Sequence, residues 1–338
     1  MTTNLEPADL DRYAATATAI ETAVGMRIAG QHELIRQTLV GLLAEGHVLL
    51  EGVPGLGKTE LVKAFSDAIG VRFSRVQFTP DLMPADIVGT QVLEEDESGH
   101  RRFQYRAGPV FTNLLLADEI NRATPKTQAA LLEAMQERHV TVAGETRPLP
   151  RPFLVLATQN PIELEGTYPL PEAQLDRFMF KATVNPPTAD VLEEILRRTT
   201  GGTFPEVPLA ADLDAVGAMI AMTPRLPVAS HLIRYVSLII QATHPGGDNA
   251  TPPVKRYVRW GASPRGAQAI ILAGKAAALI EGRPHVTAED IRWAAPAALR
   301  HRLVLGYEAT AEGVETDAII DEVLHSVPEP RPEIRGAP

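Results

Sequence analysis

Short, mostly apolar segments alternate with stretches of helical periodicity through the first half of the chain. Polar or glycine-containing residues follow each segment, as expected of strands that a sheet buries on both faces. Strands that alternate with helices in this way predict a doubly wound parallel sheet flanked by helices. The first half is therefore predicted to be an α/β domain with strands at 48–50, 73–77, 114–117 and 153–157.

Helical spacing of apolar residues dominates the rest of the chain. Near the N-terminus it extends over about residues 9–45, with breaks at Gly25 and Gly30. Beyond Asn185-Pro186-Pro187 it predicts helices only, at about 188–199, 211–222, 228–243, 263–281 and 287–304. We expect an α/β core with an N-terminal helical segment over residues 1–186, an all-α domain over 187–327 and a Pro-rich, mobile tail over 328–338.

Two further segments of the first half alternate apolar and polar residues around a glycine-containing turn. They cover residues 88–105, with a turn at Ser98-Gly99, and residues 139–147, with a turn at Gly144. Both patterns predict β-hairpins inserted into the α/β domain. Such hairpins either decorate the surface or contact a partner or substrate, since functional residues are often on loops of a rigid scaffold.

A complete phosphate-binding loop lies between the first predicted strand and a helix. Its glycines allow the tight turn in which successive backbone N–H groups point at phosphate oxygens. Lys58 supplies a flexible positive charge for the β- and γ-phosphates, and the Thr59 hydroxyl can bind Mg²⁺. The chain is therefore predicted to bind a nucleoside triphosphate through Gly52-Val53-Pro54-Gly55-Leu56-Gly57-Lys58-Thr59 and the adjoining Glu60.

Two later strands end in polar residues that suit nucleotide hydrolysis. Asp118 and Glu119 follow the apolar run 114–117. A carboxylate at the carboxyl end of such a strand can hold Mg²⁺ through water, which we assign to Asp118, and Glu119 can take a proton from the attacking water. Asn160 follows the strand at 153–157 and can hydrogen-bond the γ-phosphate or that water, although an asparagine before a proline is by itself more typical of a turn.

Two arginines are candidates for stabilising the charge on a phosphoryl group in transfer. Arg177 follows the fourth strand. Arg265 lies at the start of a predicted helix, which Ser263 as N-cap and Pro264 as first residue would fix. We expect one arginine to act within its own subunit and the other from a neighbouring subunit. For each of them an ordinary salt bridge is the alternative.

Composition narrows the class of protein. The 338-residue chain is 45% hydrophobic and 22% charged, has no cysteine and carries a formal net charge of −10. The absence of cysteine excludes disulfides, thiolate zinc sites and thiol catalysis. No apolar run reaches the roughly twenty residues of a membrane span, and the N-terminus lacks a signal-peptide pattern, so we expect a cytoplasmic protein. The acidic balance disfavours nucleic acid as a partner.

The chain resembles the MoxR family of AAA+ ATPases over about residues 15–310. Five segments carry the resemblance, and together they are far more specific than a phosphate loop: Walker B at 116–123, the following helix at 128–137, sensor 1 at 157–161, the arginine-finger segment at 169–178 and sensor 2 at 263–266. The resemblance implies a P-loop AAA+ core with a C-terminal all-α lid and the nucleotide, ATP with Mg²⁺, between them.

The resemblance also implies features that the residues alone do not indicate. Such proteins assemble as rings, usually homo-hexamers, in which Arg177 would complete the site of the adjacent subunit; Arg122 is a second candidate for this role. Ile28 and Gln31 match the segment that lines the adenine pocket. The hairpins would lie near the pore or one face of the ring. Relatives commonly work with a protein that has a von Willebrand factor A domain, in maturing protein complexes or inserting metal cofactors.

The favoured function is therefore Mg²⁺-dependent ATP hydrolysis that drives remodelling of a protein client. Three alternatives stay open: a magnesium-chelatase-like motor, a DNA-acting AAA+ motor, and a nucleotide-gated binding module that hardly hydrolyses ATP. The sequence identifies neither the client nor the partner.

Overall fold

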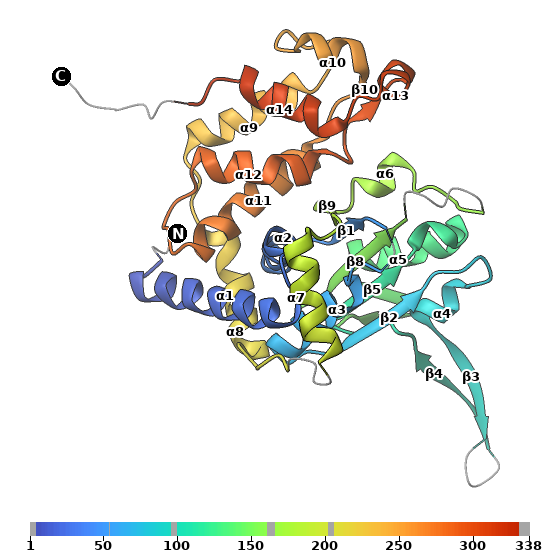
Figure 1. The fold of residues 1–338 in the computed structure, drawn as a ribbon. Coiled ribbons are helices and arrows are strands. Elements are labelled where there is room, and N and C mark those ends of the chain that lie inside the picture. Colours follow the sequence, from blue (N-terminus) through green and yellow to red (C-terminus); the bar gives the residue numbers. More distant parts are fainter. Residues whose placement is uncertain (1–4, 54, 96–99, 161–165, 202–205, 331–338) are drawn as a thin grey trace.

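The computed structural model describes residues 5–53, 55–95, 100–160, 166–201 and 206–330. At the centre of the first half lies a five-stranded parallel sheet (Figure 1), in the order β2 (Phe73–Gln77), β5 (Leu114–Asp118), β8 (Leu154–Gln159), β1 (Val48–Glu51) and β9 (Phe180–Thr183). The first four strands confirm the predicted ones. The remaining strand, β9, was not predicted; it is a short edge strand that carries Lys181 among its four residues.

Each strand sends its apolar residues to two hydrophobic clusters, one on each face of the sheet. Along β5, Leu114 and Leu116 join one cluster, whereas Leu115 and Ala117 join the other. The two-residue period of a strand explains why an unbroken apolar run can fill both cores. The first cluster continues into the helices of the second half, so the sheet and those helices share a single core.

Helices cover both faces of the sheet: α1 (Pro7–Arg27), α2 (His32–Leu43), α3 (Lys58–Ile69), α4 (Pro84–Val88), α5 (Pro125–Glu137), the short α6 (Glu172–Leu175) and the 3-10 turn η1 (Ile120–Arg122). The expected break at Gly25 is wrong, because the helical hydrogen bonds of α1 continue past it to the Ile28 N–H on the Val24 carbonyl, 3.0 Å. The break at Gly30 is confirmed: this residue has φ of +68° and separates α1 from α2.

Both predicted hairpins are present. One pairs β3 (Gly89–Glu95) with β4 (Arg101–Ala107), and the other pairs β6 (His139–Val142) with β7 (Glu145–Pro148). The predicted turn at Ser98-Gly99 lies outside the described residues. Figure 1 shows β3 and β4 extending far from the sheet, where they can reach another molecule.

The second half is helical, as predicted, except for one small strand pair. The five predicted helices correspond to α7 (Ala189–Thr200), α8 (Leu213–Met222), α9 (Ser230–Ala242), α11 (Pro264–Ile280) and α12 (Ala288–Leu299). The prediction of helices only is wrong, since β10 (Val258–Trp260) pairs with β11 (Val304–Leu305). These strands are too short to leave a periodic signal. The remaining elements are η2 (Thr223–Arg225), α10 (Pro252–Tyr257), α13 (Tyr307–Glu312) and α14 (Thr316–Ser326).

Helix α7 contacts the N-terminal helices. A side chain on Gly30 would meet Val191 of α7, with a Cβ placed 2.4 Å from its Cγ2. Arg198 donates to the carbonyl oxygens of Gly25 and Met26 at 3.0 and 2.8 Å. These contacts favour a domain boundary after α7, whereas the boundary at 186/187 rests on the sequence pattern. Of the Pro-rich tail, residues 328–330 are described and have no regular structure.

Candidate nucleotide site

The phosphate loop connects β1 to α3 at the carboxyl end of the sheet. Gly57 has φ of +80°, which side chains with a Cβ rarely adopt, and it caps α3. At Gly52 a Cβ would lie 2.6 Å from the Val184 carbonyl oxygen, so the close approach of two backbones requires glycine there. Pro54 lies outside the described residues. The local sequence therefore dictates the shape of the loop.

Most of the predicted residues meet in one pocket of about 240 Å³ beside this loop. The predicted residues among those that line it are Gly52, Gly55, Gly57, Lys58, Thr59, Glu60, Asp118, Glu119 and Asn160. The Lys58 ammonium donates to the Gly52 carbonyl oxygen. Burial lowers the pKa of Lys58, while the carboxylates of Asp118, Glu119 and Glu51 oppose that shift. The pocket thus places the Lys58 ammonium close to two acids.

Thr158 of β8 joins the two acids, because parallel strands deliver their carboxyl ends to one edge of the sheet. Its hydroxyl donates to Asp118 Oδ1 at 2.6 Å and accepts from the Glu119 N–H at 2.8 Å. Glu119 has φ of +54°, a left-handed conformation that is uncommon for a residue other than glycine. The Thr158 contact helps to hold the backbone of Glu119 in this conformation.

Two residues of β2 that sequence analysis missed also contact the acids. Arg75 donates to Asp118 Oδ2 from Nε at 3.1 Å and from Nη2 at 2.6 Å, and Gln77 Nε2 donates to Glu119 Oε2 at 2.7 Å. Both line the pocket. The available signal was their two-residue spacing, which puts them on one face of a strand next to β5. Arg122 also pairs with Glu119, at 3.0 Å.

The chemistry of the pocket fits Mg²⁺ bound together with a triphosphate. Thr59 and Asp118 offer oxygen atoms, which Mg²⁺ prefers, and this ion usually keeps waters and shares phosphate oxygens rather than occupying a protein cage. No group of three His, Cys, Asp or Glu residues that could hold a metal ion occurs in the described part of the chain.

Of the two residues expected at the adenine, Gln31 lies next to the loop, and neither residue lines this pocket. Gln31 Nε2 is 3.5 Å from the carbonyl oxygen of Leu56, which links the start of α2 to the phosphate loop. Ile28 is 8% exposed and belongs to the main hydrophobic cluster. An adenine role for Ile28 and Gln31 therefore stays a prediction that their position permits.

Arg177 and Arg265 are not brought to the phosphate loop of their own chain. They line a different pocket of about 240 Å³ together with His47, Asp176 and Arg302. His47 immediately precedes β1, whereas the phosphate loop follows β1. The two arginines therefore lie at the amino end of this strand and the phosphate loop lies at its carboxyl end. The structure does not support the expectation that one arginine acts within its own subunit.

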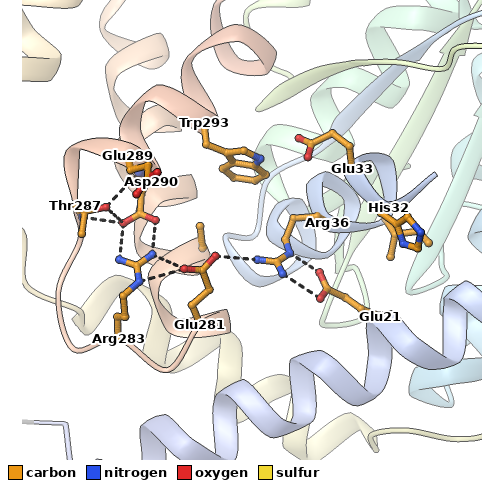
Figure 2. Close-up of a pocket in the computed structure, with 12 residues that line it drawn as sticks. Glu21, His32, Glu33, Arg36, Glu281, Arg283, Thr287, Glu289, Asp290 and Trp293 are labelled. Carbon is orange, nitrogen blue, oxygen red and sulfur yellow. Dashed lines mark hydrogen bonds and ion pairs between the residues drawn. The ribbon is translucent and has the colours of Figure 1, made fainter. Parts of the chain in front are cut away.

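A further pocket, of about 720 Å³, contains none of the predicted site residues. It lies between α1 and α2 on one side and the α11–α12 connection on the other, as Figure 2 shows. A row of ion pairs runs along its wall: Glu21 to Arg36, Arg36 to Glu281, Glu281 to Arg283, and Arg283 to Asp290. We call this row the ion-pair row; it connects the core to the second half.

A phosphate loop, acids at the end of the neighbouring strands and a helical C-terminal domain define a P-loop ATPase of the AAA+ class. Family models agree with this class. The model described as "ATPase family associated with various cellular activities (AAA)" matches residues 47–180, and that of the AAA lid domain matches residues 253–323.

Within that class, the chain belongs to the MoxR family. It is 45% identical to Chaperone MoxR1 of Mycobacterium tuberculosis, over 96% of this chain and 86% of the relative. Identity to Protein MoxR of Methylorubrum extorquens is 32%, over 96% and 99% of the two chains. A crystal structure of a Cytophaga hutchinsonii protein described as an ATPase has a TM-score of 0.89 at 39% identity and covers 95% of this chain and 97% of its own. No helix in the described ranges is long and apolar enough to cross a membrane.

Proposed function

We propose that this protein hydrolyses ATP with Mg²⁺ at sites shared between neighbouring subunits of a ring, and that hydrolysis drives chaperone-like remodelling of a protein client. The observation that carries the proposal is the separation of the two halves of the site. The phosphate loop and the acids lie at the carboxyl end of β1, and Arg177 and Arg265 lie at its amino end. A head-to-tail ring is the assembly that brings such opposite surfaces together.

Within one chain, each residue of the pocket has a role that its position supports. The loop amides and Lys58 bind the phosphates, and Asn160 holds the γ-phosphate or the attacking water. Glu119 accepts the proton that this water loses as its oxygen attacks phosphorus. Thr59 and Asp118 would hold Mg²⁺, which supplies positive charge for the phosphate oxygens when bound.

The neighbouring subunit would supply both Arg177 and Arg265. Because both arginines line one pocket, we expect both to act at the nucleotide site of the same neighbouring subunit. We therefore no longer assign one of them to its own subunit. Arg122 is engaged with the Glu119 of its own chain, which supports Arg177 as the arginine finger. Guanidinium groups from outside the subunit make turnover depend on assembly, because removing an arginine finger costs on the order of 10³-fold in rate.

The biological role is proposed from the relatives. The name Chaperone MoxR1 supports a remodelling activity on a protein client, with maturation or metal-cofactor insertion as its outcome. A homo-hexamer, a partner with a von Willebrand factor A domain and a cytoplasmic location belong to the same proposal. A magnesium-chelatase-like motor is the nearest alternative, and the net charge of −10 disfavours a DNA-acting motor.

The test is ATP turnover per subunit as a function of protein concentration, for the wild type, Glu119→Gln and Arg177→Ala. We expect wild-type specific activity to rise with concentration, and both variants to lose turnover while they retain ATP binding. A constant specific activity together with an unaffected Arg177→Ala would overturn the shared site. Tight ATP binding without turnover at any concentration would favour the nucleotide-gated module.

A further inference from the structure

Three consecutive residues directly after α12 contact the segment that carries Arg177. Arg300 donates to the Lys181 carbonyl oxygen at 2.8 Å, His301 Nε2 lies 3.0 Å from the Phe178 carbonyl oxygen, and Arg302 reaches the same segment. We call residues 300–302 the clasp. None of these contacts is implied by the sequence, since more than a hundred residues separate the two segments.

Arg302 makes the largest number of clasp contacts. Its side chain is 3% exposed, and Nε donates to Asp176 Oδ1 at 2.8 Å. Its two terminal nitrogens reach the carbonyl oxygens of Asp176 at 2.9 Å, Phe178 at 2.6 Å and Met179 at 3.1 Å. Burial lowers the pKa of this guanidinium and the bond to Asp176 raises it. A buried charge with this many acceptors is oriented in one way only.

These contacts lie on both sides of Arg177 along the backbone. Holding the carbonyl groups of residues 176 and 178 restrains the peptide plane that precedes Arg177 and the plane that follows Phe178, so Arg302 limits the directions in which the Arg177 side chain can leave the chain. The Arg177 side chain itself is held by a 3.0 Å bond from Nη1 to the Leu132 carbonyl oxygen, which it would give up on turning toward a neighbour.

Asp176 extends the same arrangement to Arg265. Both of its carboxylate oxygens accept from the Ser263 hydroxyl at 2.9 Å, and the Ser263 hydroxyl accepts from the Arg265 N–H at 3.1 Å as the N-cap of α11. Arg265 Nη1 is 3.9 Å from Asp176 Oδ2. The carboxylate of Asp176, the residue before Arg177, thus connects Arg302 to the start of α11.

We propose that Arg302, acting through Asp176, is a positioning residue that sets the orientation of both arginines offered to the neighbouring subunit. This inference rests on the proposed shared site. It makes the second domain part of the catalytic machinery, because a movement of α12 would move Arg177 and Arg265 together. Arg302 touches no part of the phosphate pocket of its own chain, so its loss should leave ATP binding intact.

The test mixes two kinds of defective subunit. Lys58→Ala subunits lack a working phosphate loop but keep the arginines, and Arg302→Gln subunits have the opposite defect. Each variant alone should show turnover at least about tenfold below wild type, since small misplacements of catalytic groups have effects of this size. Arg302→Gln should bind ATP within about twofold of wild type, and Arg302→Lys should restore part of the turnover. When the two variants are mixed in equal amounts at low concentration and then concentrated, turnover should recover to at most roughly a quarter of wild type. This is the fraction of interfaces that pair the phosphate loop of an Arg302→Gln subunit with the arginines of a Lys58→Ala subunit.

A parallel mixture of Lys58→Ala with Arg177→Ala separates the failures. If the mixture with Arg177→Ala recovers turnover and the mixture with Arg302→Gln does not, the positioning role is wrong and Arg302 serves the fold of its subunit. If neither mixture recovers turnover, the proposal of a site shared between subunits is wrong. Should Arg302→Gln not fold, Asp176→Asn replaces it under the same criteria. Arg292→Gln, at an exposed arginine of the preceding helix α12, is the matched control and should keep wild-type turnover.

Discussion

The two ends of β1 carry the two halves of the proposed site, and they are built differently. At the carboxyl end, the phosphate loop, the acids and Arg75 all come from the α/β core and contact one another across neighbouring strands. At the amino end, the clasp and Ser263 from the second domain hold the arginine segment. The first half of the site therefore needs only its own domain, whereas the second half is arranged by the lid.

The electrostatics of the two ends differ as well. The acids at the carboxyl end face a pocket that is open to a ligand, with Asp118 17% and Glu119 19% exposed. At the amino end, two histidines are buried and held neutral: burial lowers the pKa of His47 to about 4 and places that of His301 well below its ordinary value of 6.5. The carboxyl end can respond to nucleotide, and the amino end is sensitive to acid.

The sharpest contrast is between Lys58→Ala and Arg177→Ala. Removing the Lys58 ammonium leaves the phosphates without their mobile positive charge, so we expect nucleotide affinity to fall by a factor of about 100 or more, because hydrogen bonds to charged groups contribute about 1.5–3 kcal/mol each. Arg177→Ala should keep wild-type affinity, measured by binding of a fluorescent ATP analogue to dilute protein. A marked loss of affinity in Arg177→Ala would place this arginine in its own chain's site.

Acid should weaken the amino end first. His47 Nδ1 accepts the Val155 N–H at 3.0 Å, and Nε2 donates to the Met135 carbonyl oxygen, so a second proton would break the Val155 bond. The pKa of His47 is lowered from 6.5 to about 4, so the unfolded chain binds more protons between these values. Its contribution is complete above pH 6.5 and is lost as the pH falls toward 4, about 3 kcal/mol in the free energy of unfolding.

Urea unfolding at a series of pH values checks this effect. His47→Asn should be less stable than wild type at pH 7 and should lose part of the pH dependence below 6.5. His139→Gln, a change in the exposed β6–β7 hairpin, is the control and should follow the wild-type curve. Equal pH dependence in wild type and His47→Asn would mean that His47 contributes nothing to acid sensitivity.

At the carboxyl end, Arg75 occupies the carboxylate that Mg²⁺ would use. Its two bonds to Asp118 Oδ2 neutralise the acid, so Arg75→Gln should leave Asp118 more available to the ion. We expect the Mg²⁺ concentration that half-saturates ADP binding to fall about threefold, a modest change because the Arg75 side chain is 48% exposed. Arg101→Gln, in the β3–β4 hairpin, is the control. A higher Mg²⁺ requirement in Arg75→Gln would show that Arg75 assists the ion.

Sequence reasoning found the part of the site that is local in the chain. The phosphate loop, the acids and Asn160 follow predictable strands, and parallel strands bring their carboxyl ends together. Thr158, Arg75 and Gln77 were missed because their roles depend on which strands are neighbours, and the order β2-β5-β8-β1-β9 is not written in any one segment.

The amino end could not be predicted in the same way. Arg177 and Arg265 were found as residues, but not their shared pocket, because it depends on how the second domain docks on the first. Arg302 belongs to no motif, and its acceptors are mostly backbone carbonyl groups, which leave no trace in the sequence. The short pair β10–β11 was missed for the related reason that its pairing is long-range.

The ion-pair row allows the smallest and most specific test of the comparison, because it connects the lid to the core (Figure 2) and shares no residue with the pocket at either end of β1. Arg36 is its centre, paired with Glu21 of the core and with Glu281 of the lid. The Glu281 side chain is 53% exposed, so the pair with it is screened by solvent and salt. Arg36→Gln should therefore lower the free energy of unfolding by no more than about 1 kcal/mol, and the difference from wild type should shrink at high salt.

Its turnover should stay within about twofold of wild type, since the clasp rather than the ion-pair row arranges the arginines. Arg12→Gln, which removes an exposed pair with Asp9 on α1, is the matched control for loss of a surface charge. If Arg36→Gln reduced turnover as strongly as Arg302→Gln while ATP binding stayed intact, the arginines would depend on the placement of the lid as a whole. The special role of the amino-end contacts would then be lost.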